Sequence, residues 1–66
     1  MTIKLNGKAR NISDSISLMD LIRSLELDEN NTVAEVSGTI VAPENYTTVI
    51  LKDQDTVELI RFVGGG

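Results

Sequence analysis

The sequence predicts a small α+β domain in which one main helix packs across one face of a mixed sheet of four to five strands. Three observations support this prediction: a length of 66 residues, alternation of apolar and polar residues near both ends, and one segment with helical spacing between them. Strands that are far apart in a chain can pair in parallel when a helix provides the crossover. A domain of this size needs nearly every large apolar side chain for its core.

The composition excludes several classes of function. The chain contains neither cysteine nor histidine, so we expect no disulfide, no metal site of these residues and no side-chain catalysis. A net charge of -4 argues against nucleic acid as a partner, because phosphate binding requires clustered basic residues. An acidic surface fits docking on a basic patch of another protein, and it also serves solubility alone. Without a stretch that resembles a secretory signal or a membrane span, a soluble cytoplasmic protein is expected.

The N-terminal segment predicts a β-hairpin. Apolar and polar residues alternate over residues 1–5, and residues 8–12 have the pattern of a return strand. Asn6 and Gly7 lie between them, and both residue types tolerate the positive φ angles of a tight turn. The two segments are therefore expected to pair antiparallel.

The next segment carries the signals of a helix start. Ser17 can cap the free amides of the first turn, Asp20 stands three positions later to reach back, and Ile16 can pack against Leu21. Large aliphatic residues then recur at helical spacing in one stripe, namely Leu18, Leu21, Ile22 and Leu25. This stripe is expected to face the core, because so small a domain cannot leave four large aliphatic side chains exposed.

The middle of the chain predicts a second hairpin. Residues 33–36 and 39–41 have strand character, and the Ser37-Gly38 pair between them is a tight-turn signal. Pro43 lacks a backbone donor, so it ends the second strand and suits the first turn of a short helical bend. Tyr46 follows this bend and is expected to cover one end of the core.

The last strand is predicted over residues 56–63, after a polar turn. Val57 and Leu59 share one face, whereas Glu58, Ile60 and Phe62 share the other. Two interpretations of Ile60 and Phe62 are open. Either the rest of the fold covers them, or they form an exposed apolar patch that docks a partner.

The chain ends in Gly64, Gly65 and Gly66, and core packing does not explain this run. Glycine costs the most backbone entropy to order and has no side chain to bury. A segment without side chains can enter a narrow slot in a partner and present its carboxylate there. We therefore predict a folded domain over residues 1–63, a flexible tail over residues 64–66, and a reactive terminus at Gly66.

The predicted order is strand, strand, helix, strand, short bend and strand, with residues 39–41 pairing back on the strand before them and the first and last strands adjacent at the sheet centre. This is the pattern of a β-grasp. Together with residues 38–43, the acidic turn 53–55 and the ending 62–66, it resembles the ThiS family, the sulfur carrier proteins of thiamin biosynthesis and relatives of ubiquitin. Two residues depart from the family's usual pattern: Gln54 stands where a glycine is frequent, and Glu44 stands where a basic residue is frequent.

The resemblance implies a carrier that is a substrate and not an enzyme. A ThiF-like adenylyltransferase, using ATP and magnesium, would adenylate Gly66, with Gly64 and Gly65 threaded into it and Ile60 and Phe62 in the docking patch. A sulfur donor such as a cysteine desulfurase persulfide would then leave a thiocarboxylate, which thiazole synthase would use for the thiazole ring. The chain itself would bind no cofactor or metal, and the free carrier is expected to be a monomer.

Three alternatives remain at this point. The small subunit of molybdopterin synthase shares the fold and the Gly-Gly end, although its members are usually longer. A ubiquitin-like modifier would join Gly66 to lysines of other proteins. A non-catalytic β-grasp binding module would carry its glycines as an inert end, so deletion of Gly65 and Gly66 would leave such a module active and a carrier inactive.

Overall fold

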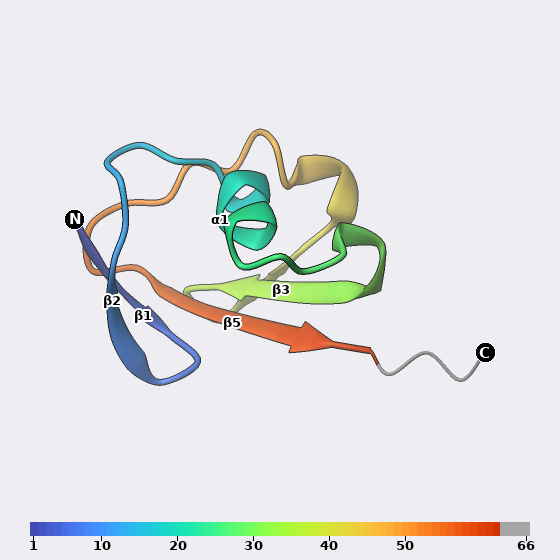
Figure 1. Cartoon of the computed structure of the whole chain (residues 1–66), viewed down its shortest axis with the longest axis horizontal. Coiled ribbons are helices and arrows are strands. Elements are labelled where there is room, and N and C mark those ends of the chain that lie inside the picture. The colour runs from blue at the N-terminus through green and yellow to red at the C-terminus, as the bar shows by residue number, and fades with distance from the viewer. Residues whose placement is uncertain (63–66) are drawn as a thin grey trace.

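The computed structural model describes residues 1–62. These residues form five strands, one α-helix and two short 3-10 helices (Figure 1). In chain order the elements are β1 (Thr2–Leu5), β2 (Lys8–Asn11), α1 (Leu18–Ser24), η1 (Glu29–Asn31), β3 (Thr32–Val36), β4 (Thr39–Val41), η2 (Pro43–Asn45) and β5 (Thr56–Arg61). No helix of this part of the chain is long and apolar enough to span a membrane.

The five strands form one mixed sheet in the order β2-β1-β5-β3-β4. The first strand and the last strand are adjacent and parallel, with Lys4 opposite Thr56 and Leu5 opposite Val57. All other neighbours are antiparallel. The prediction of a mixed β-grasp sheet with β1 and β5 at its centre is therefore confirmed.

The helix begins as the sequence predicts. The Ser17 side chain accepts a hydrogen bond from the Asp20 amide at 3.0 Å, which satisfies one of the free donors of the first turn. Leu18, Leu21 and Ile22 are buried. Figure 1 shows α1 lying across one face of the sheet, and residues 42–55 run along the same side. The opposite face of the sheet carries no element of residues 1–62.

The core lies between α1 and the sheet. Its buried apolar residues come from nearly every element: Ile3, Leu18, Leu21, Ile22, Ala34, Tyr46, Leu51, Val57 and Leu59. Tyr46 is 1% exposed, and its hydroxyl donates to the Thr32 carbonyl at 2.7 Å. A buried phenol needs such a partner, because an unpaired hydroxyl in the core is costly. The predicted position of Tyr46 in the core is thus confirmed.

Both predicted tight turns are present. Asn6 and Gly7 have φ angles of 49° and 83°, and Ser37 and Gly38 have φ angles of 52° and 82°. These left-handed conformations match the twist of the strands that the turns join. The hairpins β1–β2 and β3–β4 follow directly from them.

Several strand boundaries differ from the prediction. β1 begins at Thr2 and β3 at Thr32, each one residue away from its predicted start. β2 ends at Asn11 instead of residue 12, because Ile12 turns towards the core, although its amide still donates to the Met1 carbonyl at 2.9 Å. β5 ends at Arg61 within the described residues. The predicted domain boundary after residue 63 and the predicted flexibility of the tail lie outside the described residues.

Candidate functional site

The side chains of β5 divide between two faces. Val57 and Leu59 point into the core, whereas Ile60 is 54% exposed. Because strand side chains alternate, Glu58, Ile60 and the following Phe62 belong to the open face of the sheet. Phe62 is 57% exposed. The described part of the fold therefore leaves both side chains exposed, and their role in docking a partner stays a prediction.

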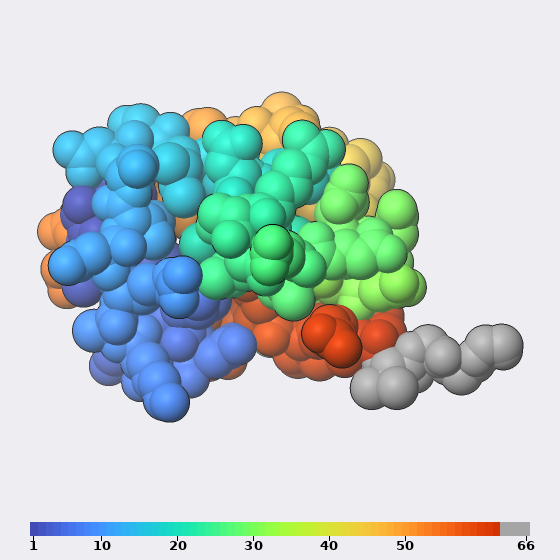
Figure 2. Space-filling model, viewed as in Figure 1, coloured from blue at the N-terminus to red at the C-terminus, as the bar shows by residue number. Residues whose placement is uncertain are grey.

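Neighbouring strands extend this patch. Val33 of β3 stands directly opposite Ile60 in the sheet register, so the two side chains share the open face. Phe62, Val33 and Ile40 also line one groove of about 270 Å³, and Ile40 is 68% exposed. We call Val33, Ile40, Ile60 and Phe62 the apolar patch. Figure 2 shows that the orange and red atoms of β5 remain at the molecular surface beside β3.

Two carboxylates lie beside the apolar patch. Glu35 of β3 stands directly opposite Glu58 of β5, and Ile40 is the partner of Glu35 on its other side. Like charges in directly opposed positions of a sheet repel each other. The open face therefore combines exposed apolar side chains with negative charge, a surface suited to a partner that presents apolar and basic groups.

The start of β5 is fixed by the acidic turn before it. Asp53 accepts a hydrogen bond from the Thr2 amide at 2.8 Å, and the Gln54 amide donates to the Thr2 carbonyl at 2.7 Å. The pKa of Asp53 is lowered, first by the Thr2 hydrogen bond and then by the Gln54 side chain, because both stabilise the carboxylate. Gln54 itself has a φ of 72°, a conformation in which glycine is favoured.

The end of β5 is fixed on the side of β3. The Phe62 amide donates to the Asn31 carbonyl at 2.8 Å. Gly64, Gly65 and Gly66, the predicted threading residues and reactive terminus, lie outside the described residues. Their roles stay predictions.

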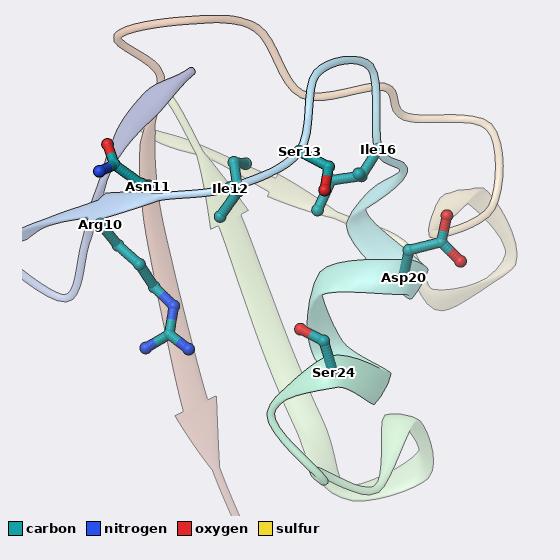
Figure 3. Close-up of a pocket in the computed structure, with 7 residues that line it drawn as sticks. All are labelled: Arg10, Asn11, Ile12, Ser13, Ile16, Asp20 and Ser24. Atoms are coloured by element: carbon teal, nitrogen blue, oxygen red, sulfur yellow. The ribbon is translucent and has the colours of Figure 1, made fainter.

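A separate hollow of about 620 Å³ lies between β2 and α1 (Figure 3). Arg10 extends into it from the strand, whereas Asp20, which also lines it, points away from Arg10. The Ser24 hydroxyl already donates to the Leu21 carbonyl at 2.8 Å. The residues that line this hollow therefore do not place an acid and a base next to each other. Residues 1–62 also contain no cluster of acidic side chains placed to hold a metal ion.

Three residues near the C-terminal end of β5 were not singled out from the sequence. Val33 and Ile40 belong to the apolar patch because of the strand register. For Val33, the alternation of side chains along residues 33–36 is the sequence signal that could have placed it on the open face. The sequence pattern indicates only a turn role for Asn6, yet its side chain forms hydrogen bonds with the backbone of Leu59. Nothing in a local pattern indicates a partner 53 positions away in the chain.

The ThiS family matches residues 3–66 of the chain. The chain belongs to the ThiS family. The sulfur carrier protein ThiS of Bacillus subtilis is 35% identical over 65 residues, covering 97% of this chain and 98% of that protein. A crystal structure of the thiamine biosynthesis protein ThiS from Geobacter metallireducens is 28% identical, covers 100% of both chains and superposes with a TM-score of 0.85.

A third relative is larger. The thiazole synthase of Paramagnetospirillum magneticum is 33% identical over 66 residues, which are 100% of this chain and 20% of that protein. A segment similar to this chain is therefore joined there to a further part of a longer protein.

Proposed function

We propose that this ThiS family protein carries sulfur as a thiocarboxylate on Gly66 and delivers it for formation of the thiazole ring of thiamin. The observation that supports this most strongly is the combination of a ThiS β-grasp over the described residues with an exposed apolar patch at the end of the strand that leads to Gly66. The proposal gives a chemical role to the run Gly64, Gly65 and Gly66.

The chemistry starts from an unreactive group. An α-carboxylate is an anion at neutral pH, so a nucleophile does not displace its oxygen directly. Adenylation solves this: a carboxylate oxygen attacks the α-phosphate of ATP, the bond to pyrophosphate breaks, and an acyl-adenylate forms. A sulfur nucleophile then attacks the carbonyl carbon and AMP leaves. If the nucleophile is a persulfide, a second thiol must cleave the resulting acyl disulfide to release the thiocarboxylate.

In this proposal the protein is a substrate of other enzymes. ATP and magnesium belong to a ThiF-like adenylyltransferase, and the sulfur belongs to a donor such as a cysteine desulfurase persulfide. The chain contributes Gly66, the threading residues Gly64 and Gly65, and the apolar patch for docking. Four residues separate Phe62 from the end of the chain, so the carboxylate lies within about 14 Å of Phe62 at full extension. A single partner surface can therefore engage the patch and the terminus together.

Thiazole synthase is the proposed acceptor of the sulfur. The Paramagnetospirillum magneticum protein of that name contains a segment similar to the whole of this chain. Joining a carrier to its acceptor raises their effective concentration, as expected for components that act in succession.

The decisive experiment is intact mass analysis of the full chain after incubation with its adenylyltransferase, MgATP and a sulfur donor. The expected product is heavier by the mass difference between sulfur and oxygen, and fragmentation should place the change on Gly66. A chain shortened by Gly65 and Gly66 is the matched control and should stay unchanged. Failure of the full chain to exchange oxygen for sulfur would contradict the proposal, and isopeptide-linked adducts in cells would instead indicate a modifier.

A further inference from the structure

The two central strands separate before β5 ends. The parallel register of β1 and β5 includes Lys4 opposite Thr56 and Leu5 opposite Val57, and the Asn6 amide still donates to the Val57 carbonyl at 2.9 Å. The chain then turns back into β2. From this point to Arg61, β5 has a neighbouring strand only on the side of β3.

The side chain of Asn6 continues the ladder that β1 leaves. Its Oδ1 accepts a hydrogen bond from the Leu59 amide at 2.8 Å, and its Nδ2 donates to the Leu59 carbonyl at 3.4 Å, the longer and weaker of the two contacts. A primary amide carries the same donor and acceptor as a peptide unit. Asn6 therefore acts as one additional strand residue beside β5.

Turn formation alone does not explain this amide. Asn6 has a φ of 49°, a conformation that asparagine, aspartate and glycine all adopt readily. Among these three, only asparagine supplies both a donor and an acceptor to a backbone unit. The hydrogen bonds to Leu59 are thus a second requirement at this position, separate from the backbone conformation.

Leu59 is the residue immediately before Ile60. Its side chain is 8% exposed, and its backbone faces Asn6, because the neighbouring positions of β5 bond to β3 on the other side. Among the described residues, Asn6 therefore makes the last hydrogen bonds from the β1 side to β5 before the apolar patch.

We propose that Asn6 is a positioning residue for carrier docking: by holding Leu59, it fixes the direction in which β5 presents Ile60 and Phe62 and leads the chain towards Gly66. This inference rests on the proposed function, because it concerns the encounter with the adenylating enzyme. Asn6 touches no reacting atom and acts only through the strand.

The test compares Asn6→Gly with the parent chain. Glycine keeps the turn conformation and removes both contacts to Leu59. Amide exchange of Leu59 by NMR is expected to become about 10-fold faster. In ATP–pyrophosphate exchange with the cognate adenylyltransferase and MgATP, the KM for the carrier is expected to rise about 5-fold while kcat stays within about 2-fold, because binding is misdirected and chemistry in the bound complex is not.

Two further variants complete the design. Ser37→Gly makes the same kind of change at the equivalent left-handed position of the β3–β4 hairpin turn, away from Leu59, and should leave both readouts unchanged. Asn6→Asp keeps an oxygen acceptor for the Leu59 amide and loses the donor, so its exchange rate and KM should lie between those of the parent and Asn6→Gly.

The inference is overturned if Asn6→Gly and Ser37→Gly have the same KM. A lower stability of Asn6→Gly would not rescue it, because stability alone does not change KM at a temperature where the protein is folded. If Asn6→Gly does not fold, the same comparison is made with Asn6→Asp. If the parent chain supports no pyrophosphate exchange, the proposed function and this inference both fail. If the parent chain supports exchange and Asn6→Gly has the same KM, only this inference fails.

Discussion

The exposed side chain of Ile60 gives the sharpest test of the proposal that the apolar patch docks the adenylyltransferase. Full burial of an isoleucine is worth about 1.5–3 kcal/mol, and 54% of Ile60 is available for burial against a partner. Ile60→Ala should therefore weaken docking by about 1 kcal/mol, which corresponds to a rise of about 5-fold in the carrier's KM for adenylation. Ile60→Asp should cost more, because it also places a charge in an apolar contact.

Ile50 provides the matched control. It is an isoleucine of similar exposure, 49%, but it lies in the segment beside α1, bridged to Ser17, and not on the open face of the sheet. Ile50→Ala should leave KM within about 2-fold of the parent. The assay is ATP–pyrophosphate exchange at varied carrier concentration, with urea unfolding of each variant to confirm that it is folded. Equal KM values for the two alanine variants would refute the reasoning.

The other predictions concern stability and are each measured by chemical denaturation. Tyr46→Phe leaves the buried Thr32 carbonyl without its 2.7 Å donor and should lower the free energy of unfolding by about 1–2 kcal/mol; a change near zero would mean that water replaces the hydroxyl. Gln54→Gly relieves a φ of 72° and should raise the free energy of unfolding by about 0.5–1 kcal/mol, whereas a decrease would show that the Gln54 side chain matters more than its backbone. The lowered pKa of Asp53 means that the unfolded chain binds the proton more readily, so its contribution is present above the ordinary value of 3.8 and is lost as the pH falls through the lowered pKa. The stability of Asp53→Asn should accordingly fall less than that of the parent over this acid range, and parallel pH profiles would contradict the assignment.

Local patterns determine much of this fold. Ser17 identifies the start of α1, the stripe from Leu18 to Leu25 identifies its buried face, and Asn6-Gly7 identifies the first hairpin turn. These features depend on residues a few positions apart, whose geometry the backbone itself dictates. The order of elements then leaves few ways to pair the strands, because a helical crossover favours parallel neighbours.

The extent of the apolar patch, the proposed docking surface, required the tertiary structure. The sequence indicates that Ile60 and Phe62 share a strand face, but whether this face is covered depends on where α1 packs. Val33 and Ile40 join the apolar patch only through the register of β3 against β5 and β4. A shift of one residue would have placed different side chains there.

By itself the sequence determined the fold class, the helix and its cap and the turns, because each depends on local conformational preference. The proposal that Gly66 is the reactive terminus also comes from the sequence, since it rests on the chemistry of a chain-end carboxylate. Only the tertiary structure decided that the face of Ile60 is open, that Glu35 stands opposite Glu58, and that Asn6 holds Leu59. These are contacts between residues distant in the chain, and their existence depends on the energy of the whole packed sheet and not on any single segment.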